Sequence, residues 1–276
     1  MAMNNSILII GYPKSGKSTF IAQFFTRIKK RKSSIKLAKI PENIKAITDT
    51  VKRLSMGEEP TTTSADENVE LLLHINVDGE NADLVCPDYG GEQVNNITDL
   101  MEINEHWHNL LNSYDRWFLF IRAHEITPEY DLSISSYEEI IKEKSTVLKV
   151  PGLSEQSKFI ELLQSLLHIK NKGLKKQVVT PTLSIILTCW DELKNKAKPV
   201  QVLQEKLPML LHFVESIWEK KSFEIYGLSA QEFSLNTPEA KEKYQNELPE
   251  NFGYMIDPTG KKDKDITKIV KASLQL

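Results

Sequence analysis

The stretch that decides the fold is Gly11-Tyr12-Pro13-Lys14-Ser15-Gly16-Lys17-Ser18, which matches the phosphate-binding loop pattern G-x-x-x-x-G-K-[ST]. An apolar run at residues 7–10 leads into it, and Phe20, Phe24 and Ile28 follow it at helical spacing. Strand, glycine loop and helix suit phosphate binding, because backbone N–H groups and a helix N-terminus then face the anion. The sequence therefore predicts a phosphate site here rather than an ordinary strand-to-helix turn.

Each residue type in the loop suggests a role. Lys17 can reach the β- and γ-phosphates, which makes it a catalytic candidate, and the Ser18 hydroxyl can bind Mg²⁺. The side chain of Lys14 is expected to be solvated and receives no role of its own. The residues predicted to contact the nucleotide here, mostly through their backbone, are Gly11, Tyr12, Pro13, Lys14, Ser15, Gly16, Lys17, Ser18 and Thr19.

Composition narrows the class of protein. The chain has 276 residues, 40% of them hydrophobic, and a formal net charge of −3. This size and apolar content support a proper core, and the charge gives no electrostatic reason to expect nucleic acid or an anionic membrane as a partner. The two cysteines, Cys86 and Cys189, lack metal-site spacing and are interpreted as free thiols. We see no signal peptide or membrane helix and expect a cytoplasmic protein.

A β-hairpin is the most useful topological signal. Residues 69–77 and 82–86 are rich in strand-forming residues, and Asp78-Gly79 between them is a hairpin turn signal. Strands joined this tightly must be antiparallel. Most nucleotide kinases with a phosphate-binding loop connect parallel strands through helices instead, so the hairpin argues against that class.

An acidic motif, Asp88-Tyr89-Gly90-Gly91-Glu92, follows the hairpin. Asp88 comes just after the predicted strand, where a carboxylate can hold a magnesium-bound water. Gly91 completes D-x-x-G spacing, and its backbone N–H can contact the γ-phosphate because no side chain intervenes. Downstream of a phosphate-binding loop, the motif favours function over an ordinary Asp/Gly loop.

The remaining chain alternates between strands and helices, which predicts one α/β domain over residues 1–276 with insertions near 35–66 and 124–177. We expect single helices over 92–113 and 199–218, with Leu100 facing inward in the first. Residues 233–251 are expected to be a polar surface excursion, and 252–260 a short extended turn. The other predicted elements are a short strand within 34–40, helices over 41–54, 154–169 and 265–274, and strands over 117–121, 182–187 and 222–227.

The ordered motifs resemble those of Ras-like (TRAFAC class) P-loop GTPases along nearly the whole chain. Thr188-Cys189-Trp190-Asp191 stands where that family has Asn-Lys-x-Asp, and Ser229-Ala230-Gln231 stands for Ser-Ala-Lys. The resemblance implies a mostly parallel sheet with one antiparallel strand and helices on both faces. It also implies that Thr188, Asp191, Ser229 and Ala230 bind guanine nucleotide, GTP or GDP. The switch threonine that binds Mg²⁺ with Ser18 and Asp88 falls among residues 61–63, and we take it as Thr63.

A narrower resemblance points to the bacterial double-GTPase branch associated with anti-phage conflict systems. It is carried by Gly90-Gly91-Glu92, by Gly253-Tyr254-Met255-Ile256 and by Asp265-Ile266-Thr267. This resemblance implies antiviral defence and a protein partner or second GTPase subunit.

The departures from the family pattern bear on two predictions, the rate of hydrolysis and the specificity for guanine. Glu92 follows Gly91 where Ras-like proteins have the glutamine that orients water, and Gln93 comes one residue late. Glu92 and Gln93 are thus the candidates for that catalytic role, and hydrolysis is expected to be slow without a partner. Only Asp191 of the fourth motif is kept, which weakens the prediction of guanine specificity. Two alternatives therefore remain: a GTP-binding assembly or signalling module with little hydrolysis, and a P-loop ATPase or small-molecule kinase.

Overall fold

The computed structural model describes residues 5–30, 33–41, 44–58, 70–87, 92–126, 154–173, 175–193 and 197–276. Thr63 and its neighbours Thr61 and Thr62 lie outside the described residues, as do Asp88 and Gly91. The side chain of Glu92 also lies outside them. The metal and γ-phosphate roles predicted for these residues stay predictions.

One sheet organises the described chain, with strand order β2-β3-β4-β1-β5-β6-β7-β8-β9. The central strands run parallel: β4 (Glu80–Cys86), β1 (Ser6–Ile10), β5 (Arg116–Arg122), β6 (Thr182–Thr188) and β7 (Phe223–Ser229). Their carboxyl ends therefore share one edge of the sheet, where open α/β sheets bind ligands. The phosphate-binding loop follows β1 at this edge.

Antiparallel strands flank the parallel centre on both sides. The predicted hairpin is confirmed: β3 (Leu71–Val77) pairs antiparallel with β4, and Asp78 and Gly79 form its turn at φ 53° and 100°. Three more antiparallel pairings join β2 (Lys36–Leu37) to β3, β8 (Tyr254–Ile256) to β7, and β9 (Lys262–Asp263) to β8. The fold class is confirmed, and among the described strands β8 runs against the central ones in addition to β3, the one antiparallel strand that was expected.

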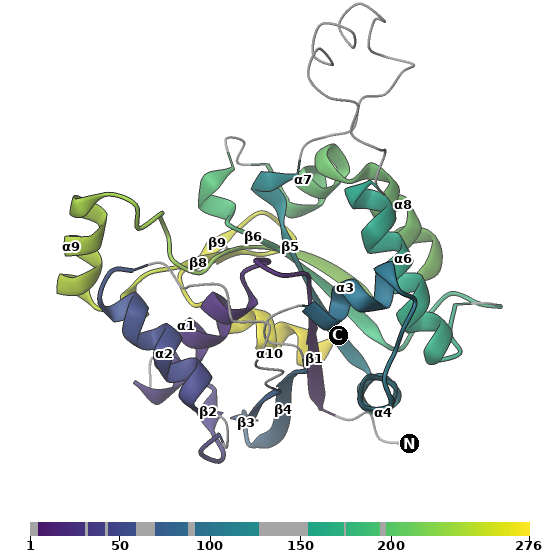
Figure 1. Ribbon diagram of the computed structural model, residues 1–276, viewed down its shortest axis with the longest axis horizontal. Helices are drawn as coiled ribbons and strands as arrows, with labels where there is room; N and C mark the ends of the chain where they lie inside the picture. Colours follow the sequence, from purple (N-terminus) through teal and green to yellow (C-terminus); the bar gives the residue numbers. More distant parts are fainter. Residues whose placement is uncertain are drawn as a thin grey trace, which may run out of the picture.

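Helices cover both faces of the sheet (Figure 1). Ile7 and Ile9 of β1 pack on one face, and Leu8 and Ile10 pack on the other, so the strand alternates between two cores. The first core lies under α1 (Lys17–Lys29), α2 (Ile44–Ser55) and α10 (Lys268–Gln275). The second lies under α3 (Glu92–Asp99), α4 (Glu105–Ser113), α6 (Glu155–Ile169), α7 (Pro199–Lys206) and α8 (Pro208–Ile217).

Two expected helices are each broken into two, so those predictions were wrong. The 92–113 segment stops after Asp99 and restarts at Glu105, where the Asn104 side chain caps the Trp107 N–H. Leu100 lies in the break and is 58% exposed rather than inward-facing. The 199–218 segment breaks at Leu207, because Pro208 cannot donate a helical hydrogen bond and starts α8 instead.

The predicted surface excursion at 233–251 contains a helix that closes a third core. This helix is α9 (Pro238–Glu247), capped by Thr237, and it lies beside α2 at one end of the molecule (Figure 1). A 3₁₀ turn, η3 (Pro249–Asn251), follows it. Tyr244 of α9 stacks on Phe252 at a ring distance of 4.5 Å, and both pack on Ala22 of α1. The polar sequence concealed this packing because a few aromatic residues carry it.

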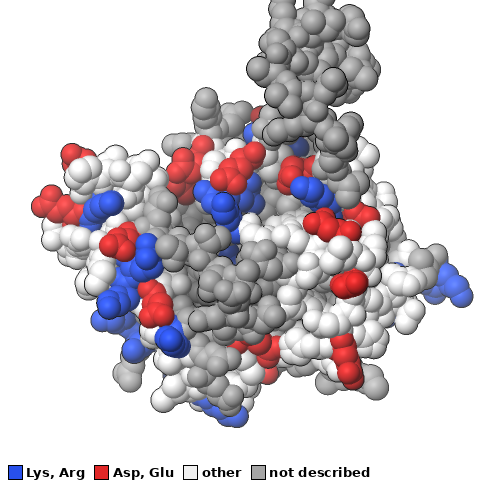
Figure 2. Space-filling model, viewed as in Figure 1, with Lys and Arg blue, Asp and Glu red and all other residues white. Residues whose placement is uncertain are grey.

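Charge is mixed over the surface. On the face shown in Figure 2, basic and acidic side chains of the described residues lie interspersed, without a wide field of one sign. Within the described ranges, the structure contains no helix of the length and apolar character that spanning a membrane requires.

Candidate nucleotide-binding site

The loop between β1 and α1 turns sharply around residues with left-handed backbone. Lys14 has φ 61° and Gly16 has φ 90°, and the Ser15 N–H donates to the Tyr12 carbonyl at 3.2 Å. Gly16 is the N-cap of α1, whose first residue is Lys17. The first N–H groups of α1 therefore face the inside of the loop, as an anion site requires.

Lys17 spans this loop from within. Its Nζ donates to the carbonyls of Gly11 at 2.6 Å and Tyr12 at 3.0 Å, and it lies 3.4 Å from Ser15 Oγ. The side chain is only 3% exposed. A buried ammonium held by loop carbonyls can exchange these acceptors for phosphate oxygens with little movement.

Ser18 is the described residue best suited to bind Mg²⁺. It occupies the second position of α1 and is half-buried, and its hydroxyl has no hydrogen-bond partner among the described residues. A hydroxyl beside a phosphate site is the kind of hard oxygen ligand that Mg²⁺ prefers. Ser18 thus fits the ion, although no cluster of three or more His, Cys, Asp or Glu side chains suited to a metal occurs among the described residues.

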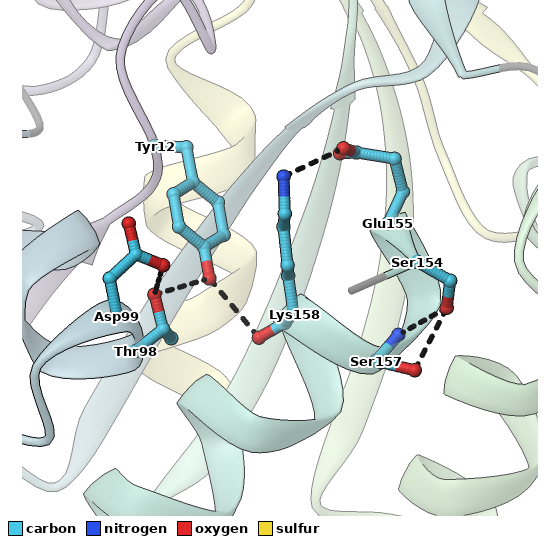
Figure 3. Close-up of polar contacts among 7 residues, drawn as sticks. All are labelled: Tyr12, Thr98, Asp99, Ser154, Glu155, Ser157 and Lys158. Carbon is cyan, nitrogen blue, oxygen red and sulfur yellow. Dashed lines mark hydrogen bonds and ion pairs between the residues drawn. The ribbon is translucent and has the colours of Figure 1, made fainter. Parts of the chain in front are cut away.

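Tyr12 connects the loop to α3 and α6, two helices that cover the same face of the sheet (Figure 3). Its hydroxyl donates to the Lys158 carbonyl of α6 at 3.1 Å and lies 3.4 Å from Thr98 Oγ1 of α3, while its ring packs edge-on against Phe159. Burial raises the pKa of Tyr12 to about 12, so the hydroxyl keeps its proton at neutral pH. The loop is thereby connected to α3, the helix that follows the Asp88–Gly91 motif.

The start of α6 is itself well fixed, which makes it a firm anchor for Tyr12. Ser154 caps the helix by accepting from the Ser157 N–H at 3.0 Å, and Lys158 pairs with Glu155 at 3.2 Å (Figure 3). The Lys158 carbonyl that accepts from Tyr12 lies in this capped first turn.

Thr188 supports the loop from the end of β6. Its hydroxyl lies 2.8 Å from the Ser15 carbonyl and 3.2 Å from the Ile121 carbonyl, and the side chain is 3% exposed. It also packs against Gly16, where a Cβ would come within 3.2 Å of it. The structure thus places Thr188 against the phosphate loop, and a direct contact with the nucleotide stays a prediction.

A tight turn after β6 presents Asp191. Cys189 adopts the left-handed conformation at φ 52° and precedes the 3₁₀ turn η2 (Trp190–Glu192). Burial raises the pKa of the Cys189 thiol to about 11, so the thiol is neutral. Trp190 is 5% exposed and lies flat on Gly227 of β7, where a Cβ would come within 2.5 Å of the indole. The Trp190–Gly227 contact therefore sets how Asp191 leaves the sheet.

Gly227→Ala should lower both stability and nucleotide affinity. The added methyl group must push Trp190 away, and overpacking of this kind costs about 1–3 kcal/mol. We expect a melting temperature lower by several degrees, measured by differential scanning calorimetry, and weaker nucleotide binding by titration.

The matched control is the double variant Gly227→Ala/Trp190→Phe, in which the smaller ring leaves room for the methyl group. It should recover part of the lost affinity. An unchanged melting temperature for Gly227→Ala would show that Trp190 does not rest on this glycine.

Asp191 does not cap the next described helix. Its carboxylate is half-buried, and no described residue donates a hydrogen bond to it. The alternative interpretation, an N-cap for the next described helix, is not supported, because Lys198 occupies the N-cap of α7. The half-buried carboxylate is thus partly accessible at this edge of the sheet, and its contact with guanine stays a prediction.

Ser229 and Ala230 leave β7 at the same edge. Ser229 is fully buried, and its Oγ accepts from the Glu232 N–H at 2.9 Å. Ala230 follows it and is half-buried. The serine therefore folds the loop, which leaves the backbone of Ala230 as the group available to a ligand.

Two further polar side chains near the site, Gln93 and Arg122, bond to other residues of the chain. The Gln93 Oε1 accepts from Trp107 Nε1 at 2.8 Å and from Asn104 at 3.4 Å, so its side chain is directed to α4. Arg122, at the end of β5, pairs with Glu125 at 3.1 Å and donates to the Lys14 carbonyl at 3.5 Å. Gln93 would have to leave Trp107 in order to orient a water molecule.

The sequence did not predict several contacts that hold the candidate site in place. Trp190, Gly227 and the Tyr12 hydroxyl act through contacts distant in sequence. The one local signal was a tyrosine inside a glycine loop, where a large aromatic residue needs somewhere to pack.

Comparison with solved structures finds GTP-binding proteins of low sequence identity. The structure of the S. cerevisiae Ski7 GTPase-like domain bound to GTP is similar at a TM-score of 0.46 and 14% identity, with 83% of this chain and 43% of that chain covered. The putative nucleolar GTP-binding protein 1 of Plasmodium falciparum is similar at a TM-score of 0.40 and 12% identity, with 91% and 89% covered. This chain thus spans less than half of the Ski7 chain.

A search of the curated proteins finds no match. The decisive comparison is with protein families, where the profile named Double-GTPase 1 matches residues 8–272, from the first strand to the last helix. That span includes every motif on which the double-GTPase resemblance was predicted. The chain therefore belongs to the Double-GTPase 1 family.

Proposed function

We propose that this chain binds GTP with Mg²⁺ and hydrolyses it to GDP and phosphate, acting as a nucleotide-dependent switch in the cytoplasm. The observation that carries the proposal is the meeting of three groups at one sheet edge: the Lys17 loop, Asp191 and the Ser229–Ala230 backbone. The proposed phosphate-binding and guanine-binding groups then follow parallel strands of one sheet, with β5 lying between β1 and the neighbouring pair β6 and β7. Membership of the Double-GTPase 1 family supports the same assignment.

Each group has a part in the proposed reaction. Lys17 and the loop N–H groups hold the β- and γ-phosphates and stabilise the charge that develops on them, since phosphoryl transfer depends mainly on positioning and electrostatics. Mg²⁺, when bound at Ser18 with Asp88 and Thr63, would neutralise charge between the β- and γ-phosphates. Gly91 would contact the γ-phosphate, and Asp191 would accept the guanine protons.

Water activation is the weakest part of the proposed machinery. Glu92 and Gln93 stay the candidates, but the Gln93 oxygen is bonded to Trp107 and Asn104. This contact favours slow intrinsic hydrolysis, and it supports a second candidate function, a GTP-binding assembly module that barely hydrolyses. The family resemblance implies that a protein partner or second GTPase subunit, in antiviral defence, would supply the missing group.

Single-turnover phosphate release tests this function. With Mg²⁺ and excess protein, we expect GTP to be hydrolysed at a rate on the order of 10⁻³ s⁻¹ or below, similar to unassisted GTPases. Trp107→Phe removes the indole N–H that holds Gln93 and should raise this rate if Gln93 orients water. ATP should neither compete with GTP nor be hydrolysed.

Preferential hydrolysis of ATP would overturn the proposal in favour of an ATPase or kinase. Tight GTP binding without measurable phosphate release, in both the parent and Trp107→Phe, would select the assembly module instead.

A further inference from the structure

The segment around Gly253 lies directly against the loop proposed to read the base. Strand β8 pairs antiparallel with β7, and Tyr254 stands opposite Ser229 in this register. Gly253 therefore lies next to Ala230, beyond the end of the ladder. The sequence predicted an extended turn here and showed a family resemblance, and the proposed hydrolysis does not use the segment.

Gly253 fits against the loop because it has no side chain. Its φ is 96°, and a Cβ at this position would come within 2.6 Å of the Ala230 carbonyl and 3.0 Å of the Ser229 carbonyl. Both atoms belong to the backbone, so they cannot move aside without moving the loop. The position of Ala230 is thus set by contact with Gly253.

Glu232 closes the loop onto the same glycine. Its Oε2 accepts from the Gly253 N–H at 3.3 Å, and its own N–H donates to Ser229 Oγ. Glu232 also has a positive φ of 73°, which is uncommon for a residue with a side chain and must be held by its surroundings. The four residues 229–232 therefore form a closed turn fastened to Gly253.

Arg27 connects this segment to the phosphate side. It lies in α1, the helix that begins with Lys17, and is 4% exposed. Its guanidinium donates to the carbonyls of Phe252, Gly253 and Lys264 at 2.5 to 3.3 Å. A buried cation is costly unless it is hydrogen-bonded, so these carbonyls are held firmly in place. One rigid helix thus joins the phosphate loop to the segment that supports Ala230.

We propose that Phe252–Gly253, held by Arg27, forms a brace that positions the Ser229–Ala230 backbone for the nucleoside part of the ligand, with Gly253 as the positioning residue. The inference rests on the proposed function, since it assigns a cause to the specificity of that same site. The brace fixes the separation between the base and phosphate subsites, so it should affect recognition of the nucleoside and leave phosphate binding intact.

Gly253→Ala tests the brace, and Gly79→Ala is its matched control. Both glycines have φ near 100°, so both substitutions carry a similar backbone strain, but a Cβ at Gly79 meets no atom within 4 Å. Dissociation constants for GTP, ATP and inorganic tripolyphosphate are measured by calorimetric titration. A shift of the loop by several tenths of an ångström should weaken GTP binding by about tenfold in Gly253→Ala. The preference for GTP over ATP should narrow, while tripolyphosphate binding should not change in either variant.

Two results for Gly253→Ala would overturn the brace. One is an equal loss of affinity for GTP and for tripolyphosphate, and the other is unchanged GTP affinity with only a lower melting temperature. A parent protein that binds tripolyphosphate but prefers ATP would refute the proposed guanine site. The brace would then be judged by the ratio of ATP to tripolyphosphate affinity in the same variants.

A second pair of variants covers the case in which Gly253→Ala does not fold. Glu232→Ala removes the acceptor of the Gly253 N–H, and Glu232→Gln keeps an oxygen there. We expect about three- to fivefold weaker GTP binding in the alanine variant, corresponding to one lost hydrogen bond, and recovery in the glutamine variant. Equal behaviour of the two variants would count against the brace.

Discussion

Lys17→Ala should reduce triphosphate affinity by about 100-fold or more while leaving the fold intact. The ammonium already lies inside the loop, where it can meet the β- and γ-phosphates of a bound nucleotide. Removing it leaves two loop carbonyls without this donor, but the Tyr12 carbonyl still accepts from the Ser15 N–H. The measurements are GTP titration and far-ultraviolet circular dichroism.

Two variants separate the charge from its surroundings. Lys17→Met keeps an unbranched apolar stem in the buried space, so it should lose affinity without loss of packing. Lys30→Ala, at the other end of the same helix, removes an exposed lysine and should bind GTP as the parent does. If Lys17→Ala keeps its affinity for GTP with a native spectrum, the phosphate site is not at this loop.

The strand, loop and helix of the candidate phosphate site were predictable because their signals are consecutive in the chain. The residues 7–10, the glycine loop and the spacing of Phe20, Phe24 and Ile28 need no distant partner to be interpreted. The same is true of the hairpin at Asp78-Gly79, where a two-residue turn dictates antiparallel pairing.

The helix breaks show where periodicity misleads. Apolar spacing continues through Leu100, yet the chain leaves the helix there because Met101 adopts φ 53°, a conformation that no simple pattern predicts for methionine. The restart at Glu105 did carry a signal, since Asn104 is a good N-cap. Pro208 carried one too, because proline inside a helical pattern marks a boundary.

The base half of the site depends on contacts that sequence order conceals. Arg27 and Phe252 are separated by 225 positions, and Thr188 and Ser15 by 173. Thr188 was predicted to contact the nucleotide by analogy with the family motif; its hydroxyl donates to the Ser15 and Ile121 carbonyls, and the nucleotide contact stays a prediction. The sheet order places β6 beside β5 and close to the phosphate loop. A small hydroxyl side chain suits position 188 because it can donate to carbonyls of both.

Asp191→Asn should lose GTP by about 10²–10⁴-fold and gain xanthosine triphosphate. Guanine presents N1–H and its exocyclic amine as adjacent donors, and a carboxylate accepts both in charge-assisted hydrogen bonds. An asparagine offers one acceptor, while its amide can donate to the O2 of xanthine. Because no described residue donates to the Asp191 carboxylate, the substitution should leave the melting temperature unchanged.

Glu192→Gln is the matched control for that variant. Glu192 lies in the same 3₁₀ turn and is exposed, so its substitution removes the same charge one residue away. It should bind GTP as the parent does, because the Glu192 carboxylate is exposed to solvent. If the loss of negative charge alone weakened binding, both variants would bind GTP less tightly, and this result would contradict a specific role for Asp191.

Undiminished GTP binding by Asp191→Asn would mean that guanine is recognised elsewhere, and it would reduce the proposal to a general nucleotide-binding site. A switch from GTP to xanthosine triphosphate in this variant alone requires that the Asp191 carboxylate contacts the base edge, which links the turn after β6 to specificity.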